Sequence, residues 1–282
     1  MVDKIRVALV GQGIGASLSP AMHEGEGRAQ GLDLAYGLIE TGLEERPLGE
    51  ILARARDDGL TGLNITHPHK IEVLAHLDDL SETAERLGAV NTVVFRDGRA
   101  LGHNTDVTGF AAGFAQEMAG VAMARVLLLG AGGAGAAVAF ALMARGVGHL
   151  VVRDPDGVRA RALVAKLRQY WPGAGVSLLD RLTRAGTDGL NGVVNATPMG
   201  MANFPGAAFP AALLHGQLWV GDIVYFPLET ALLANARALG CRVMPGSAMA
   251  IWQAVHAFEL FTGRRADPAR MRAIFFALTH AP

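Results

Sequence analysis

The stretch Arg125-Val-Leu-Leu-Leu-Gly130-Ala-Gly-Gly-Ala-Gly135 decides the fold class of this chain. Its apolar beginning predicts a buried strand over 125–129, and its end opens an alanine-rich helix over 133–145. The glycines match G-x-G-x-x-G, a pattern that allows a tight turn and close backbone approach to a pyrophosphate at the helix N-terminus. A dinucleotide-binding loop is therefore predicted at Gly130, Gly132, Gly133, Ala134 and Gly135. The alternative is a glycine-rich turn that binds nothing.

An acidic residue follows the next predicted strand, 149–152. Asp154 lies 19 residues after the last glycine of the loop. A carboxylate there accepts hydrogen bonds from both adenosine ribose hydroxyls and repels a 2'-phosphate. We therefore expect NAD, with NADP disfavoured. Two alternatives remain: Asp154 is a solvated turn residue before Pro155, or Arg153 and Arg159 hold a phosphate.

Strand and helix patterns alternate on both sides of this loop, which predicts an α/β fold. Before the loop, strands are expected at 5–10, 34–39, 62–66 and 89–95, and helices at 48–56, from Pro68 to about 77, and from the cap Ser81 to Gly88. Ser19-Pro20 is expected to start a further helix with Ser19 as its N-cap, and Asp97-Gly98 to form a hairpin turn. After the loop, a helix at 158–169 and strands at 192–195 and 218–223 predict a parallel sheet. The last 35 or so residues show only helices, 248–262 and 267–278, which we expect to pack on the first region.

Composition narrows the class of protein. The chain has 282 residues, a formal net charge of -1 and 51% hydrophobic residues, so it can build one or two packed cores. A balanced charge argues against a nucleic-acid partner. The single cysteine, Cys241, excludes an internal disulfide framework and a cysteine-based zinc site. Glycines divide the uncharged stretch 126–144 into strand and helix, and no signal peptide is evident, so we expect no membrane association and a cytoplasmic location.

Three polar clusters lie at predicted strand ends or loops, where function concentrates in α/β proteins. They are Ser17-Leu-Ser19-Pro-Ala-Met-His23, Asn64-Ile-Thr66-His-Pro-His-Lys70, and Asn91-Thr92 with Gly102-His-Asn104-Thr-Asp106. Hydroxyls at a helix N-terminus suit a carboxylate, and together the clusters favour a small polyhydroxylated substrate. The alternatives are helix capping by Ser19, a surface turn with a solvated Lys70, and ordinary Asn/Asp turn chemistry.

No metal site is predicted. His67, His69 and His103 lack a carboxylate at ligand-like spacing. Gln253 is the conspicuous polar residue of a mostly apolar helix, and the alternative there is an exposed glutamine on an amphipathic face.

In combination, these segments resemble the shikimate/quinate dehydrogenase family. The matching pieces are the three clusters, Gly88-Ala-Val, Val107-Thr-Gly109, the glycine loop, Asn195-Ala-Thr-Pro-Met-Gly200, Asp222-Ile-Val-Tyr-Phe-Pro227 and Met249-Ala-Ile-Trp-Gln-Ala254. The resemblance runs in order over nearly the whole chain. It implies an N-terminal substrate domain, 1–107 rejoined by the helices of 246–282, and a Rossmann-type dinucleotide domain, 108–245.

The resemblance also implies the reaction and its residues. The reaction is reversible hydride transfer between nicotinamide and C3 of shikimate or quinate, with Lys70 as acid/base and Asp106 orienting it. Ser17 and Ser19 would hold the substrate carboxylate, and the remaining substrate contacts would be Asn64, Thr66, Asn91, Tyr225 and Gln253. Besides the glycine loop and Asp154, the cofactor contacts would be Arg159, Thr197, Met199, Val224 and Gly246.

Departures from the biosynthetic shikimate dehydrogenases point toward the NAD-using branch. Here Gly13-Ile-Gly-Ala16 replaces Pro-Ile-x-His, Glu24 replaces Asn, and Arg153-Asp-Pro155 replaces Asn-Arg-Thr. An aminated relative of shikimate as substrate, a folate-type or amino-acid dehydrogenase, and a dinucleotide-sensing binding protein remain alternatives. The sequence leaves the oligomeric state open, and a homodimer is one possible assembly.

Overall fold

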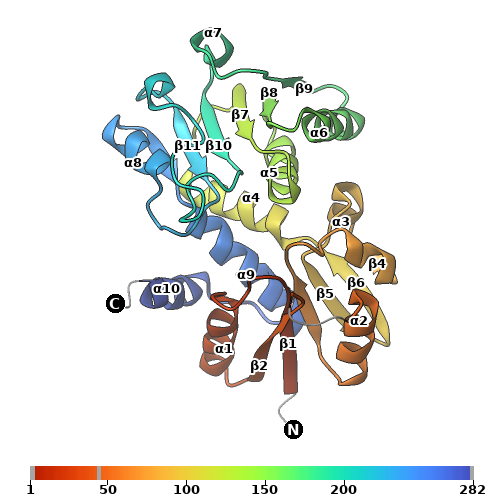
Figure 1. Ribbon diagram of the computed structural model, residues 1–282. Coiled ribbons are helices and arrows are strands. Elements are labelled where there is room, and N and C mark those ends of the chain that lie inside the picture. The colour runs from red at the N-terminus through yellow and green to blue at the C-terminus, as the bar shows by residue number, and fades with distance from the viewer. Residues whose placement is uncertain (1–3, 43–45, 280–282) are drawn as a thin grey trace. The chain divides into compact units, whose positions relative to one another are not determined.

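The computed structural model describes residues 4–42 and 46–279. The chain divides into two compact units, Met1–Thr105 with Ile251–Pro282 (the first unit) and Asp106–Ala250 (the second unit). Within the described residues, each unit contains a six-stranded sheet with helices packed against it (Figure 1). The α/β class predicted from the alternating pattern is confirmed.

The sheet of the first unit is mixed. Its strands are β1 (Lys4–Gly11), β2 (Asp33–Glu40), β3 (Gly62–Ile65), β4 (Asp79–Leu80), β5 (Thr92–Arg96) and β6 (Arg99–His103), in the order β2-β1-β3-β5-β6-β4. β1 pairs in parallel with β2 and β3, whereas β5 is antiparallel to β3 and β6. Asp97 and Gly98 both have positive φ, 53° and 76°, and they form the predicted hairpin turn between β5 and β6.

Helices cover both faces of this sheet. They are α1 (Ser19–Ala29), α2 (Leu48–Asp57), the 3₁₀ helix η1 (Glu72–His76), α3 (Glu82–Leu87), the later part of α9 (Gly246–Thr262), and α10 (Pro268–Thr279). One core cluster lies under α2, with Leu63, Ile65 and Val90, and another lies under α9, with Tyr36 and Phe261. Ser81 caps α3, and Gly88 ends it at φ 69°, as predicted.

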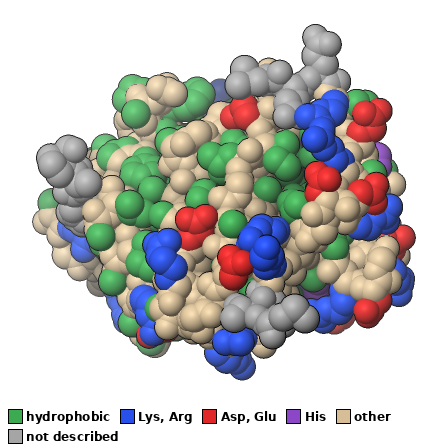
Figure 2. Space-filling model, turned by 90° about the horizontal axis from the view of Figure 1, so that it is seen from below, with side chains coloured by type: hydrophobic (Ala, Val, Ile, Leu, Met, Phe, Trp, Pro, Cys, Tyr) green, Lys and Arg blue, Asp and Glu red, His purple; other side chains and the backbone are tan. Residues whose placement is uncertain are grey.

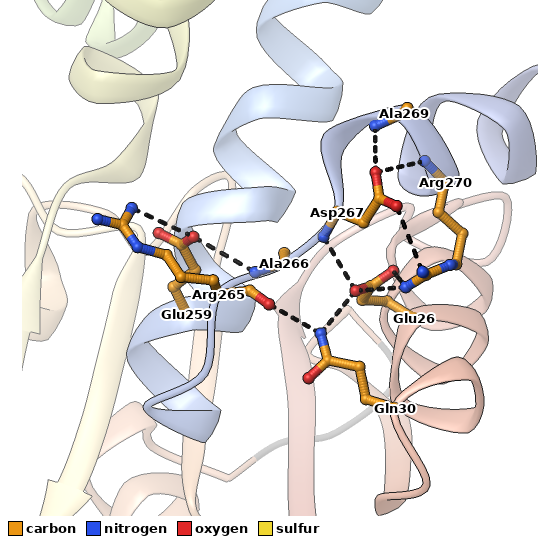
Figure 3. Close-up of polar contacts among 8 residues, drawn as sticks. All are labelled: Glu26, Gln30, Glu259, Arg265, Ala266, Asp267, Ala269 and Arg270. Atoms are coloured by element: carbon orange, nitrogen blue, oxygen red, sulfur yellow. Dashed lines mark hydrogen bonds and ion pairs between the residues drawn. The ribbon is translucent and has the colours of Figure 1, made fainter.

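The C-terminal helix α10 packs beside α1, joined by a buried carboxylate (Figure 3). Glu26 is fully buried, and its two oxygens accept hydrogen bonds from Arg270 Nη1 at 2.9 and 2.8 Å. The Asp267 N–H and the Gln30 amide donate to the same carboxylate at 3.0 and 2.7 Å. The charge of Glu26 is thus paired and hydrogen-bonded, which is the condition for burying a carboxylate.

Two local predictions for the first unit are wrong. An α-helix does not run from Pro68 to residue 77. The Val90 N–H donates to the Lys70 carbonyl, which removes that acceptor from a helical ladder, and only η1 forms. Nor is Ser19 the N-cap of α1, since Leu18 occupies that position and Ser17 Oγ accepts the Ser19 N–H at 3.3 Å.

The sheet of the second unit is parallel throughout, as predicted. Its strands are β7 (Arg125–Leu129), β8 (His149–Arg153), β9 (Gly175–Leu178), β10 (Gly192–Asn195), β11 (Trp219–Asp222) and β12 (Arg242–Met244), in the order β12-β11-β10-β7-β8-β9. Its helices are α4 (Thr105–Glu117), α5 (Gly133–Ala144), α6 (Gly157–Tyr170), α7 (Arg184–Thr187), η2 (Ala211–Leu213) and α8 (Ala231–Ala238). The strand order reverses between β7 and β10, and ligands of doubly wound sheets bind at such a point, beyond the strands' carboxyl ends.

The uncharged stretch 126–144 forms β7, the glycine loop and α5, as predicted. Among the described helices, none is long and apolar enough to cross a bilayer. Figure 2 shows basic and acidic side chains interspersed on the face it presents, so the coloured side chains there form no broad field of one sign.

Candidate active site

Of the two serines expected to hold a carboxylate, Ser19 is the first residue of α1 and Ser17 lies in the loop before it. This loop is tied to the end of β2, because both oxygens of Glu40 accept backbone hydrogen bonds, from Gly13 and Ile14, each at 3.0 Å. These bonds lower the pKa of Glu40. Ser17 and Ser19 are half-buried. Since the Ser19 side chain does not cap α1, the capping alternative is excluded for this residue.

A buried hydrogen-bond network lies at the end of β3. Asn64 Nδ2 donates to the Asn91 carbonyl at 3.2 Å and to Thr92 Oγ1 at 3.0 Å. Asn64 Oδ1 accepts from the hydroxyl of Tyr36 at 2.8 Å. Asn91 continues the network, because its Oδ1 accepts the Thr105 N–H at 2.7 Å. Asn64 and Asn91 are thus brought together, although 27 residues separate them.

The segment after β3 carries Thr66 and Lys70, both half-buried. The Thr66 N–H donates to the Val10 carbonyl and the Lys70 carbonyl accepts from Val90, so this segment is tied to β1 and to the chain before β5. Gln253, also half-buried, lies on α9 within the first unit. Together with the serines and the asparagines, all the predicted polar substrate contacts except Tyr225 belong to this unit.

In the second unit, the glycine loop joins β7 to α5. Gly130 has φ 97°, and a Cβ there would lie 2.7 Å from the Ala196 carbonyl oxygen. A Cβ on Gly135 would collide with the Gly130 carbonyl, so this glycine is required for close packing of α5 on the strand. Around Gly132 and Gly133 the space is open apart from the Arg159 guanidinium, 4.0 Å from an added Cβ on Gly132. No side chain of the described residues caps this end of α5.

Asp154 lies just after β8, at the mouth of this loop. Its Oδ2 accepts the Ala131 N–H at 2.7 Å, and its Oδ1 accepts the Asp156 N–H at 2.8 Å. Asp156 is the N-cap of α6. The carboxylate oxygen that does not cap the helix, Oδ2, forms an ion pair with the Arg159 guanidinium at 3.7 Å. The uncapped N-terminus of α5 and the open space over its glycines fit the pyrophosphate of a dinucleotide. The carboxylate of Asp154 beside them fits the ribose.

Two further loops follow β10 and β11, and a buried trio fixes them. Asn195 Nδ2 donates to Asp222 Oδ1 at 2.9 Å, and Thr230 Oγ1 donates to Asp222 Oδ2 at 2.7 Å. Burial raises the pKa of Asp222 to about 6, although these bonds act in the opposite direction. We call Asn195, Asp222 and Thr230 the loop-anchoring trio.

The trio holds three of the predicted cofactor contacts, Thr197, Met199 and Val224, by hydrogen bonds. Asn195 Oδ1 accepts both the N–H and the hydroxyl of Thr197, and its amide donates to the Met199 carbonyl at 2.9 Å. The Val224 N–H donates to Asp222 Oδ1 at 3.0 Å. Gly246 lies so close to the Val224 carbonyl that an added Cβ would collide with it.

Tyr225 and Asp106 belong to this second unit as well. Desolvation raises the pKa of Tyr225, and the negative charge of Asp106 raises it further. Asp106 is buried at the start of α4.

Sequence reasoning gave no role to Tyr36, Asp222 or Thr230. Tyr36 and Asp222 bond Asn64 and Asn195, which are distant in the chain, whereas Thr230 bonds Asp222 eight residues before it. Asp222 was noted only as part of a matching motif. Among the described residues, no cluster of three or more His, Cys, Asp or Glu side chains suits a metal ion.

The second unit is a parallel, doubly wound sheet that carries the glycine loop. The first unit, in the same chain, is a mixed-sheet unit rich in buried amides and hydroxyls. This combination defines the class of two-domain dehydrogenases. Residues 9–93 match the family model "Shikimate dehydrogenase substrate binding domain", and residues 246–274 match "Shikimate 5'-dehydrogenase C-terminal domain".

Relatives that match nearly the whole chain belong to the same family as these two models. A shikimate dehydrogenase (NADP(+)) of Streptomyces avermitilis is 53% identical, over 96% of this chain and 94% of that protein. A quinate/shikimate dehydrogenase (NAD(+)) of Corynebacterium efficiens is 50% identical, over 98% and 99%. The structure of quinate dehydrogenase from Corynebacterium glutamicum in complex with NAD superposes with a TM-score of 0.93 at 46% identity, covering 98% and 99% of the two chains.

The chain belongs to the shikimate dehydrogenase family. It is an NAD(P)-dependent alcohol oxidoreductase, and its cofactor is a nicotinamide dinucleotide. Because relatives of similar identity are named for NAD and for NADP, the family alone does not fix which dinucleotide is preferred.

Proposed function

We propose that this protein is an NAD-preferring quinate/shikimate dehydrogenase. It interconverts shikimate and 3-dehydroshikimate, or quinate and 3-dehydroquinate, by oxidation and reduction at C3. The observation that carries the cofactor preference is the carboxylate of Asp154, held at the glycine loop by the Ala131 N–H. Relatives named for NAD, 46–50% identical over nearly the whole chain, support the same reading.

The two parts of the chain take separate tasks in this proposal. Residues 1–107 with 246–282 bind the hydroxylated cyclic carboxylate, and residues 108–245 bind the dinucleotide. The polar side chains of the first part are mostly uncharged amides and hydroxyls. Such groups suit hydroxyl recognition, since each buried partner left unpaired by a wrong substrate costs binding energy.

Lys70 accepts the proton of the C3 hydroxyl during oxidation and returns it during reduction. Asp106 hydrogen-bonds a ring hydroxyl and orients the lysine. Ser17 and Ser19 donate hydrogen bonds to the substrate carboxylate. The hydroxyls are read by Asn64, Thr66, Asn91 and Gln253, with Tyr225 near the carboxylate.

The open space at the glycine loop indicates which residues hold the dinucleotide. The N-terminal N–H groups of α5, from Gly133 to Gly135, take the pyrophosphate, and Asp154 takes the adenosine ribose. Arg159 flanks the loop, while Thr197, Met199, Val224 and Gly246 line the nicotinamide side. The bound nicotinamide supplies the hydride acceptor and donor.

The purified protein should form NADH from NAD with shikimate, quinate or both, and the reaction is followed by absorbance. An aminated shikimate in the same panel tests that alternative substrate directly. A protein that binds NAD without turning over any of the three compounds would be a dinucleotide sensor, and the proposed function would be overturned.

A further inference from the structure

The carboxylate of Glu40 is held by backbone N–H groups of the loop that carries Ser17. Its Oε1 accepts from Gly13 and its Oε2 from Ile14, each at 3.0 Å, and the Gly42 N–H also donates to Oε1, at 3.3 Å. Gly13 has φ 67°, and successive N–H groups in a turn of this kind form a concavity that binds anions. Glu40 therefore occupies an anion site that the chain itself forms.

The register of the sheet explains why Glu40 reaches this loop. β1 and β2 are parallel, and Gly11, the last residue of β1, pairs with Glu40, the last residue of β2. The loop begins directly after Gly11, so its first residues pass beside the glutamate. Thr41 fixes the end of β2 in turn, because its N–H donates to the Gly11 carbonyl at 2.9 Å and its hydroxyl is hydrogen-bonded to His69 Nε2 at 2.8 Å.

The hold on Ile14 extends to Ser17. The Ile14 carbonyl accepts the Ser17 N–H at 2.9 Å, and the Ile14 side chain is buried in the core cluster under α9. One residue therefore donates its N–H to Glu40 and holds the serine through its carbonyl. Ser17 Oγ in turn accepts the Ser19 N–H at 3.3 Å. The position of Ser17 thus depends on how the Ile14 peptide groups are held.

We propose that Glu40 is a positioning residue: it holds the loop before α1 so that Ser17 meets the substrate carboxylate. The inference rests on the proposed function for the role of Ser17. Glu40 itself does not bind the substrate, since its charge repels the acid group of shikimate or quinate. The hydrogen bond from Ile14, followed by those from Gly13 and Gly42, lowers the pKa of Glu40, so the group stays ionised near neutral pH.

Glu40→Gln keeps the shape of the side chain and removes one of the two acceptors. The amide oxygen can serve either Gly13 or Ile14, and the amide NH₂ then faces the other N–H donor. The loosened loop should raise KM for shikimate or quinate by about fivefold, the scale of one hydrogen bond, while kcat and KM for NAD change by less than about twofold. The sign is diagnostic, because loss of a negative charge alone would leave KM for an anionic substrate unchanged or lower it.

Two comparisons show whether the effect runs through Ser17. In the Ser17→Ala background, Glu40→Gln should raise KM by less than about twofold, because the residue it positions is already lost. The matched control is Asp33→Asn, at the first residue of β2, where the carboxylate pairs with Arg6 at 3.3 Å. This control makes the same change of charge on the same strand but away from the loop, and KM should not change.

Gly13→Ala disturbs the same anion site from the side of the loop. Apart from its chain neighbours, an added Cβ there meets no atom of the described residues within 4 Å, so the effect comes from the φ of 67°, which alanine adopts only with strain. This variant should also raise KM for the substrate and spare KM for NAD. It keeps the inference testable if Glu40→Gln does not fold.

An unchanged or lower KM in Glu40→Gln, or in Gly13→Ala where the first variant does not fold, overturns the inference. A loss confined to kcat, or an equal rise of KM in Asp33→Asn, overturns it too. So do independent, multiplicative effects of Glu40→Gln and Ser17→Ala, because Glu40 would then not act through the serine. If the wild-type protein oxidises neither shikimate nor quinate, the proposed function falls and takes the inference with it; wild-type turnover without the pattern overturns the inference alone.

Discussion

The Ala131 N–H donates a 2.7 Å hydrogen bond to Asp154 Oδ2, so the acid after β8 is tied to the glycine loop after β7. The chain itself therefore holds this carboxylate in place, with no arginine partner needed. Each carboxylate oxygen has a second lone pair beyond the backbone bond it accepts, so the acid can still receive ribose hydroxyls.

Two replacements of Asp154 distinguish the effect of its negative charge from the effect of its hydrogen bonds. We expect Asp154→Ala to erode the preference for NAD over NADP, because a 2'-phosphate no longer meets a like charge within the Debye length of about 8 Å. Asp154→Asn removes the charge but keeps an acceptor, so it should gain NADP activity while losing less NAD activity. Steady-state kcat/KM for both cofactors measures this, and the pH profile of kcat should not move. Unchanged ratios in both variants would assign the preference elsewhere.

Lys70→Ala should lower kcat by at least about a hundredfold, the effect of removing a general acid/base, with little change in dinucleotide binding. Asp106→Asn should also lower kcat. Because the two residues act as a unit, the double variant should be little worse than the worse single variant. Turnover and dinucleotide affinity of all three are compared with wild type, and a near-normal kcat for Lys70→Ala would contradict its role.

Because Asp222 is buried, we expect the loop-anchoring trio to contribute more to folding stability at acidic pH. Its folded pKa of about 6 lies above the ordinary 3.8, so the folded state binds the proton more tightly than the unfolded state. The contribution of this group to stability is therefore full below about pH 4, falls as pH rises to about 6, and is level above. Urea unfolding of wild type and Asp222→Asn across this window should show the variant gaining on wild type by roughly 2–3 kcal/mol as pH rises. A constant difference between the two would show that Asp222 does not titrate there.

Arg270 and Arg265 form a matched pair of tests near the end of the chain. Arg270→Ala leaves the buried Glu26 carboxylate without its cationic partner and should lower the free energy of unfolding by about 2–3 kcal/mol. Arg265, with a 94% exposed side chain, pairs with Glu259 at 3.6 Å, and Arg265→Ala should cost less than about 1 kcal/mol. Denaturant unfolding distinguishes them, and equal losses would contradict the assignment of the buried pair.

Much of the second unit could be predicted from the sequence, because the patterns that indicate its strands and its glycine loop lie within short segments. The strands at 125–129 and 192–195 were placed to the residue, and the distance from the glycine loop to Asp154 is a property of one βαβ unit. The edge strands β9 and β12 were missed, since Gly175-Val-Ser-Leu178 and Arg242-Val-Met244 are too short for a periodic pattern.

What escaped prediction depends on contacts between distant segments. The helix expected after Pro68 fails because Val90, twenty residues beyond Lys70, takes its carbonyl. Tyr36 reaches Asn64 across β1, which lies between their two strands and pairs with Tyr36 through Val7 and with Asn64 through Leu9. The anchoring trio likewise needs β10 beside β11. No local pattern specifies these partners.

The preference between NAD and NADP tests the account most directly. With purified wild-type protein and shikimate or quinate as substrate, we predict kcat/KM for NAD at least about tenfold above that for NADP, a difference of about 1.4 kcal/mol. Equal values, or a preference for NADP, would contradict the account and show that Arg153 and Arg159 bind the 2'-phosphate in spite of Asp154.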